Sequence, residues 1–167
     1  MQLIKLGIIS LVVLFGIVTA ISLLLPSEVI VSRPIDLQVS PDSVQAYLSN
    51  LDNWEKWLDH SDTAHFSIDK KAGKITFQNT HITLVSSQPG KILTQWQVGD
   101  GAKMAGDFRF IKHPNNPLFT LQWQFTQHIK WYPWEKFASI LSDKALGPYM
   151  ERSLTKLKEQ VEPKMSN

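Results

Sequence analysis

The sequence predicts an α+β fold, in which an antiparallel sheet of about seven strands is covered on one face by a long C-terminal helix and preceded by one N-terminal transmembrane helix. Three observations predict it. The first 25 residues contain a long uncharged apolar segment, residues 64–129 alternate with a period of two between turn signals, and residues 146–162 repeat with the period of an α-helix. At 167 residues, the chain has the length of one domain.

The N-terminal segment is long enough to cross a membrane. Residues 6–25 are twenty residues without a charge, and a helix of that length rises about 30 Å, the thickness of a bilayer core. A cleaved signal peptide is the alternative, because residues 18–20 read Val-Thr-Ala and Lys5 supplies a positive end. Signal cores usually run about 7 to 15 residues, whereas this one continues to Leu25, so an uncleaved anchor is favoured.

The charges around this segment predict an orientation. Lys5 and the amino terminus are the only positive charges before Arg33, which favours a cytoplasmic N-terminus and a domain on the outer, periplasmic or extracellular, side of a single-pass protein. We assign residues 1–26 to the anchor, residues 27–162 to the folded domain and residues 163–167 to a C-terminal tail.

The composition narrows the classes of function. Of 17 Lys and Arg residues only Lys5 lies in the anchor, so 16 basic residues face 15 acidic ones in the remainder. Near neutrality argues against a nucleic-acid partner, whose binders usually carry a concentrated basic face. The absence of cysteine excludes disulfides, thiolate metal sites and a cysteine nucleophile. We expect no cofactor and no metal, and the sequence names no protein partner.

The domain begins with a strand and two short helices. Residues 29–39 alternate roughly as in a strand, and Pro34 within them indicates an edge strand or a bulge. Residues 40–42, Ser-Pro-Asp, form a helix start, with Ser as the cap and Pro in the first helical position. A second short helix is expected to hold Trp54, Trp57 and Leu58.

Six further strands are predicted from period-two segments separated by Gly, Pro and Asn turn signals. They span residues 64–70, 74–79, 81–88, 91–98, 107–113 and 117–129. In the last segment Phe119, Leu121, Trp123 and Phe125 alternate with polar residues, which assigns one face to the interior and the other to water. The segments should form an antiparallel meander with one large apolar face.

The C-terminal helix supplies the cover for that face. Its apolar residues Leu146, Met150, Leu154, Leu157 and Val161 are separated by three or four positions and form one stripe. Since no other long amphipathic helix is predicted in the domain, this stripe is expected to pack on the sheet.

Two local patterns resemble a known superfamily. Residues 31–59 combine a strand, a Ser-Pro helix start and the pair Trp54 and Trp57, and residues 146–162 place Gly147 ahead of Glu151 and the apolar stripe. With the order of elements, these patterns resemble the helix-grip fold of the START-related SRPBCC superfamily, in particular its polyketide cyclase/dehydrase and lipid-transport branch. The resemblance covers about residues 28–162 and concerns architecture more than chemistry.

The resemblance implies a curved sheet that grips the helix, with a cavity between them for a hydrophobic ligand. Such pockets usually have a volume of about 300 to 1,000 Å³. A domain of this size also needs most of its large apolar side chains to fill its core. The candidate lining residues are Trp54, Trp57, Phe77, Trp96, Phe108, Phe110, Trp123, Phe125, Met150 and Leu154.

Three functions remain open. The first is a membrane-anchored binding domain for a hydrophobic small molecule or lipid. The second is a polyketide cyclase-like or hydrolase-like enzyme on an apolar substrate, which would need a hydrogen-bonded titratable pair in the cavity. The third is an interaction module without a cavity. The resemblance carries over no catalytic residue, and the charged residues nearest the apolar elements are Lys103, Asp107, Arg109 and Glu135, with Arg109 expected to face outward.

Two further segments have a functional and a structural interpretation. Residues 59–65 contain two histidines and two aspartates, but His60 and His65 have no metal-site spacing, so a solvated loop is favoured. Residues 131–134, Trp-Tyr-Pro-Trp, suit either a membrane interface or packing over the end of the sheet. Packing is favoured, and it would bury the rings.

Overall fold

The computed structural model describes residues 2–60, 66–114 and 118–162. The helices are α1 (Gln2–Leu24), α2 (Pro41–Ser49), the 3-10 helix η1 (Leu51–Asn53), α3 (Trp54–Trp57), α4 (Pro133–Ser139) and α5 (Ser142–Val161). The strands are β1 (Glu28–Leu37), β2 (Phe66–Asp69), β3 (Lys74–Phe77), β4 (Thr80–Gln88), β5 (Lys91–Val98), β6 (Met104–Lys112) and β7 (Phe119–His128). The predicted α+β architecture is confirmed.

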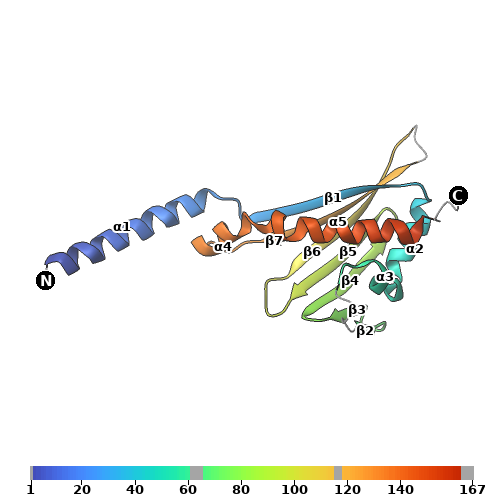
Figure 1. The fold of residues 1–167 in the computed structure, drawn as a ribbon, viewed down its shortest axis with the longest axis horizontal. Coiled ribbons are helices and arrows are strands. Elements are labelled where there is room, and N and C mark those ends of the chain that lie inside the picture. Colours follow the sequence, from blue (N-terminus) through green and yellow to red (C-terminus); the bar gives the residue numbers. More distant parts are fainter. Residues whose placement is uncertain (1, 61–65, 115–117, 163–167) are drawn as a thin grey trace.

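All seven strands form one antiparallel sheet in the order β1-β7-β6-β5-β4-β3-β2. Strands β2 to β7 follow one another as a meander, and β1 returns to pair with β7 over their full lengths, from Glu28 opposite His128 to Leu37 opposite Phe119. The first strand is therefore an edge strand, with a neighbour on one side only. This agrees with the prediction from Pro34, because proline has no backbone N–H to donate and is confined largely to edge strands and bulges. Figure 1 shows the curvature of the sheet and α5 lying along its concave side.

Local sequence explains the start of the first domain helix. The Ser40 side chain accepts a hydrogen bond from the backbone N–H of Ser43 at 3.1 Å, and Pro41 occupies the first turn of α2. This is the expected cap, in which a hydroxyl satisfies an amide that has no partner inside the helix. Trp54 and Trp57 form α3, also as expected, and Leu58 follows directly as its C-terminal cap residue.

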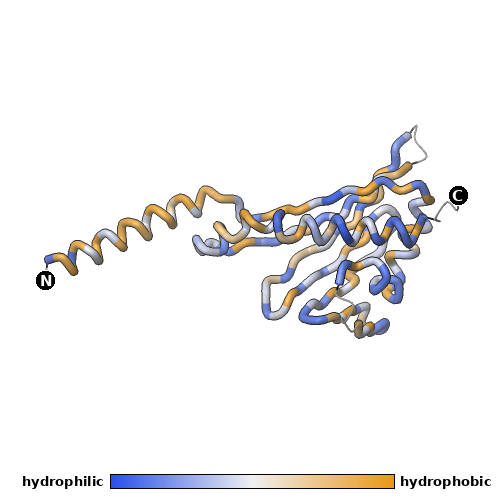
Figure 2. Tube along the Cα trace, viewed as in Figure 1, coloured by the Kyte–Doolittle hydropathy of each residue, from blue (hydrophilic) through white to orange (hydrophobic). Residues whose placement is uncertain are grey.

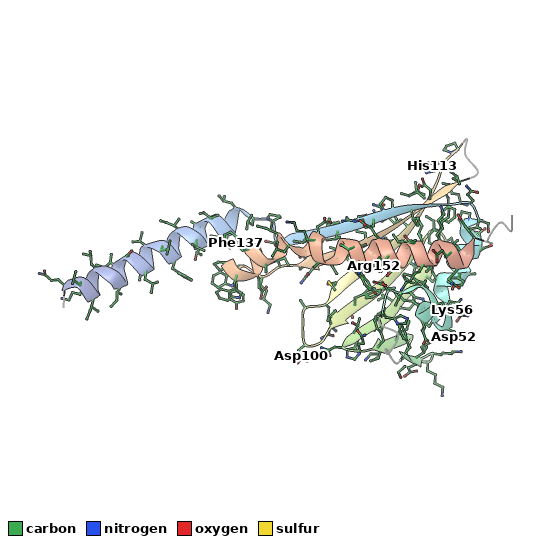
Figure 3. All side chains as sticks on the ribbon, viewed as in Figure 1. Asp52, Lys56, Asp100, His113, Phe137 and Arg152 are labelled. Carbon is green, nitrogen blue, oxygen red and sulfur yellow. The ribbon has the colours of Figure 1, made fainter. Side chains whose placement is uncertain are left out.

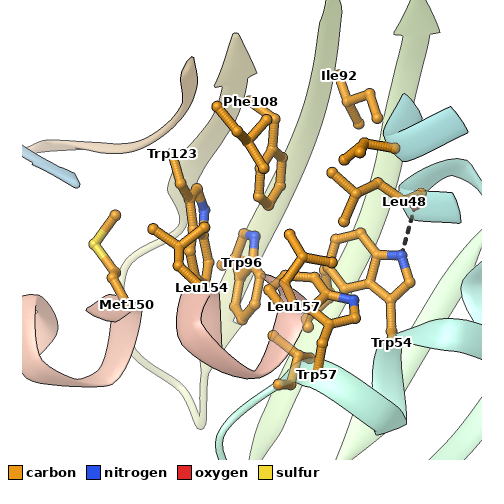
Figure 4. Packing of buried hydrophobic residues seen from close by; sticks show 14 of the residues in the cluster. Leu48, Trp54, Trp57, Ile92, Trp96, Phe108, Trp123, Met150, Leu154 and Leu157 are labelled. Carbon is orange, nitrogen blue, oxygen red and sulfur yellow. Dashed lines mark hydrogen bonds between the residues drawn. The ribbon is translucent and has the colours of Figure 1, made fainter. Parts of the chain in front are cut away.

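The core lies between the sheet and α5 and consists largely of aromatic rings. Trp54 and Trp57 project from α3 towards Phe108 and Trp123 of the sheet, and the Phe108 and Trp123 rings stack with centroids 5.2 Å apart. Figure 4 shows this cluster with Met150, Leu154 and Leu157 of α5 packed against it. The stripe of the terminal helix thus covers the apolar face of the sheet, as its spacing predicts.

Two elements of the domain begin more than two residues before their predicted starts. Strand β6 begins at Met104 rather than at Asp107, and α5 begins at Ser142 rather than at Leu146. The sequence also did not predict α4, a helix of seven residues. Such a helix makes barely two turns, too few for a period of 3.6 residues to be recognised.

Helix α1 projects away from the domain and is exposed over almost its whole length (Figure 1). It is the one described helix that is long and apolar enough to cross a membrane, with 23 residues, and Figure 2 shows it as mostly hydrophobic. An apolar helix of this length, with Lys5 as its one charged residue, suits either a single-pass anchor or a signal sequence.

Candidate functional site

A pocket of about 330 Å³ lies between the sheet and the first turns of α5. Most of its wall is apolar, and Phe77, Trp96 and Phe125 reach it from the strand faces that the alternation assigns to the core. The lining residues are Asp59, Phe77, Gln78, Thr80, Trp96, Val98, Met104, Phe125, Ala145, Leu146 and Tyr149. The volume lies at the small end of the range for ligand sites.

The strand ends position the polar part of this wall. Gln78 joins β3 to β4 and has a φ of 48°, a left-handed conformation that non-glycine residues adopt uncommonly. The turn is held by the next hairpin, since the Gly99 N–H donates to the Asn79 carbonyl at 2.6 Å. A strained backbone conformation of this kind persists only where the surrounding structure imposes it, and at Gln78 it lies in the wall of the pocket.

Tyr149 places a buried phenol beside the pocket. Its hydroxyl is inaccessible to solvent and has no hydrogen-bond partner among the described residues. Burial raises the pKa of Tyr149 far above its usual range, an effect that the nearby Ser153 hydroxyl opposes without meeting hydrogen-bond geometry. A buried hydroxyl without a partner costs about 1 to 3 kcal/mol, so a ligand oxygen that accepted its proton would remove that cost.

Asp59 supplies the carboxylate of the wall, and α5 holds it firmly. Its oxygens accept from Lys156 Nζ at 2.9 Å and from Arg152 Nε at 2.6 Å. These two hydrogen bonds lower the pKa of Asp59, Lys156 contributing most. The Asp59 backbone N–H also donates to the Ser153 hydroxyl at 2.9 Å. The carboxylate is therefore already neutralised by two cations of α5.

The predicted cavity residues fall into three groups. Phe77, Trp96 and Phe125 line the pocket. Phe110 is half-buried and stacks on Phe119, with centroids 5.9 Å apart. The remaining six fill the core beneath the pocket: Trp54, Trp57, Phe108, Trp123, Met150 and Leu154. Alternation identifies the inward face of each strand, but not which inward side chain stands next to a void.

The charged residues suggested by the sequence lie elsewhere. Asp107 forms ion pairs with Lys91 at 3.4 Å and with Arg109 at 2.9 Å, and Arg109 is exposed as expected. Glu135 lines a separate, more polar pocket of about 530 Å³ beside α4. Sequence reasoning missed the other eight pocket residues, among them Asp59, Leu146 and Tyr149. For Leu146 and Tyr149 a signal existed, because both lie in the first turns of the helix that covers the sheet.

The histidine-containing segment is described only in part. His60 Nε2 lies 2.9 Å from the Glu55 carbonyl, and its ring meets Phe66 edge-on. Residues 61–65, including His65, lie outside the described residues. Within the described ranges, no three His, Asp or Glu side chains cluster as metal ligands would.

The aromatic segment after β7 differs from its expected packing. Trp131 and Trp134 are 58% and 62% exposed, so their rings do not pack over the end of the sheet. Tyr132 is half-buried and stacks on Trp134 with centroids 4.9 Å apart, while Pro133 is buried. The favoured interpretation of this segment is therefore wrong for both tryptophans. The reason is that Lys136, and not an aromatic ring, takes the buried side of α4.

The two titratable groups at the pocket wall are Asp59 and Tyr149. No hydrogen bond joins them within the described part of the chain, where Asp59 is taken up by Arg152 and Lys156. The pocket itself provides the internal volume that an interaction module without a cavity would lack.

Comparisons with known proteins agree with this architecture. The model of the family described as polyketide cyclase / dehydrase and lipid transport matches residues 28–162. Comparison with curated protein sequences gave no match. Solved structures with a similar fold include the di-domain ARO/CYC StfQ from the steffimycin biosynthetic pathway, with a TM-score of 0.59 and 15% identity over 80% of this chain. The chain spans 50% of the length of StfQ.

Two further structures are similar over most of both chains. A START superfamily protein from Mycobacterium smegmatis has a TM-score of 0.56 and 16% identity, over 80% of this chain and 97% of that one. Norcoclaurine synthase from Thalictrum flavum, solved with dopamine and hydroxybenzaldehyde, has a TM-score of 0.59 and 11% identity, over 84% and 90% of the two chains. At these identities the similarity concerns the fold alone.

Proposed function

Because this chain belongs to the polyketide cyclase/dehydrase and lipid-transport family and has its ligand-binding helix-grip domain, we propose that it is a membrane-anchored protein that binds one hydrophobic small molecule or single-chain lipid. The ligand occupies the pocket between the sheet and the first turns of α5. Its apolar body contacts Phe77, Trp96 and Phe125, and one oxygen accepts a hydrogen bond from Tyr149.

The observation that carries this proposal is a mostly apolar pocket between the sheet and α5 whose wall includes the phenol side chain of Tyr149. Ligand sites typically combine a mostly apolar wall with a few placed polar groups that fix orientation. Asp59 is unsuited to bind a ligand cation, because Lys156 and Arg152 already neutralise it. A neutral ligand with one oxygen is therefore the best match to this wall.

The anchor in this proposal is α1, with its N-terminus in the cytoplasm and the domain outside. Its length and lack of charge after Lys5 support a bilayer-spanning helix. The mass of the intact protein extracted from native membranes tests the anchor directly. A mass that includes residues 1–26 supports an uncleaved helix, whereas a mature form that begins after residue 20 identifies a cleaved signal sequence.

Native mass spectrometry of the full chain, incubated with a lipid extract of its host, tests ligand binding. We expect one released ligand of a single mass class per protein. Leu146→Trp fills the pocket mouth and should abolish that adduct. Ile111→Trp adds the same bulk at an exposed position of β6 that is not part of the pocket, and should leave the adduct in place. A folded protein without any adduct, or equal loss in both variants, would contradict the proposal.

A further inference from the structure

Helix α4 has the reverse of the usual polarity for a surface helix. Its buried residues are Pro133 and Lys136, one turn apart on the inner side. Its outer side and the residues that follow are apolar and exposed: Trp134, Phe137, Ile140 and Leu141. These recur at spacings of three and four, so they form one outward stripe. A helix on a water-exposed surface usually has the opposite arrangement, with its apolar stripe buried and a lysine such as Lys136 exposed.

Lys136 explains how this orientation is held. Its ammonium group donates to the Leu25 carbonyl at 3.0 Å and to the Ser27 hydroxyl at 2.8 Å. Both acceptors lie in the few residues that link α1 to β1. The backbone adds a second tie, since the Ile129 N–H donates to the Ser27 carbonyl at 2.8 Å. Helix α4 is thereby fixed at the point where the apolar helix ends and the domain begins.

The exposed rings extend the stripe beyond α4. Tyr132 contacts both tryptophans: its ring stacks on Trp134 with centroids 4.9 Å apart and is tilted against Trp131 with centroids 4.8 Å apart. Trp131 and Trp134 remain exposed although they lie in a domain whose other four tryptophans are buried. Trp and Tyr are enriched at the level of lipid headgroups, where an apolar ring and a polar edge are both satisfied. Figure 3 marks Phe137 at this junction, beside the end of α1.

We propose that residues 131–141 form a second membrane contact, which we call the interfacial segment, seated in the headgroup region of the same bilayer that α1 crosses. This inference rests on the anchoring proposed above for α1. If residues 6–25 span the hydrocarbon core, Leu25 and Ser27 lie at its surface, and Lys136 holds α4 at the same depth. The apolar surface of α1 then continues into the exposed stripe of the interfacial segment.

This seating also orients the ligand pocket. The pocket is lined by Ala145, Leu146 and Tyr149, which follow the interfacial segment within the first turns of α5. The pocket therefore lies at the membrane-proximal end of the domain, whereas His113 lies at the far end (Figure 3). A hydrophobic ligand would exchange between the bilayer and the pocket over a short path, without crossing the outer end of the domain.

Tryptophan emission from the full chain in phosphatidylcholine vesicles tests the inference. Lipids brominated on an acyl chain near the headgroup quench only tryptophans close to them. Helix α1 contains no tryptophan, and the other four tryptophans are buried in the core, so quenching reports on Trp131 and Trp134. We expect brominated vesicles to lower the emission relative to unbrominated ones, and the double variant Trp131→Phe with Trp134→Phe to lose that difference.

Two additions to the double variant serve as matched controls. Phe137→Trp returns a tryptophan to the exposed stripe and should restore quenching. His113→Trp places one at the distal end of the domain and should stay unquenched. Vesicle flotation is measured on every sample. A wild-type protein that floats but is not quenched overturns the interfacial segment and leaves the anchor intact. A protein that does not float overturns both, and quenching that persists in the double variant overturns the segment.

Discussion

The guanidinium group of Arg33 lies directly against Gly147, at a point where any side chain on α5 would collide with it. Arg33 projects from edge strand β1 and bonds Glu151 through Nε at 2.6 Å and Asp143 through a terminal nitrogen at 2.9 Å. Residues 143, 147 and 151 are four apart and form one stripe of the helix. Because Gly147 has no side chain, space is left on α5 between Asp143 and Glu151, and the guanidinium group of Arg33 occupies it.

Gly147→Ala is expected to destabilise the protein through this contact. The new Cβ displaces the guanidinium and breaks both ion pairs, and a residue other than glycine before Pro148 is also disfavoured in a helix. In the Arg33→Ala background the collision is absent, so the same change should cost less by about 0.5 kcal/mol or more. Chemical unfolding of the four proteins of this double-mutant cycle measures the difference. Equal costs in both backgrounds would contradict the close contact.

Gly106→Ala should destabilise the core beside the pocket. A Cβ at Gly106 would meet the Thr94 hydroxyl and the Trp96 indole nitrogen, which bond each other at 2.9 Å. Overpacking of this kind costs about 1 to 3 kcal/mol. The midpoint of unfolding and the near-ultraviolet circular dichroism of the tryptophans report the change. An unaltered spectrum together with native stability would show that Trp96 does not depend on this space.

Tyr149→Phe should stabilise the unliganded protein and weaken ligand binding. It removes a buried hydroxyl without a partner, and we expect a gain of about 1 kcal/mol in the free energy of unfolding. Tyr47→Phe is the matched control, because its hydroxyl is also buried and unpaired but lies outside the pocket. Both variants should gain stability, whereas only Tyr149→Phe should lose ligand. Equal ligand occupancy in the two would remove Tyr149 from the site.

Asp59 should make stability depend on pH in the acid range. Hydrogen bonds from Lys156 and Arg152 lower the pKa of Asp59 in the folded state. The contribution of Asp59 to the free energy of unfolding is therefore fully present above its unfolded pKa of about 3.9, and it is lost as the pH falls through its folded pKa. Asp59→Asn should cost about 1 kcal/mol at neutral pH, because its partners are well exposed. The difference from wild type should shrink below about pH 4.

Unfolding at a series of pH values checks this expectation, with Asp52→Asn as control. Asp52 pairs with Lys70 on the surface, where both side chains are exposed, so its loss should matter little at any pH. A cost for Asp59→Asn that stays constant down to strongly acid pH would show that the carboxylate is not stabilised by these cations.

Much of the fold follows from the sequence, because period and turn residues are local properties. The alternation of Phe119, Leu121, Trp123 and Phe125 predicts both a strand and its buried face, and the stripe from Leu146 to Val161 predicts the helix that covers it. The uncharged residues 6–25 likewise predict a helix of membrane length. Each of these signals depends only on neighbours a few positions away.

The tertiary structure alone decided which side chains meet. Trp123 and Phe125 share one face of β7, yet Trp123 fills the core and Phe125 lines the pocket, because the void depends on the position of α5. Asp59 meets Arg152 and Lys156 across 93 and 97 residues of chain. The reversed polarity of α4 also arises at long range, since Lys136 turns inward to bond Leu25 and Ser27. Local periodicity determines which face of a helix or strand is buried, whereas contacts between residues distant in sequence determine which side chains fill the core and which line the pocket.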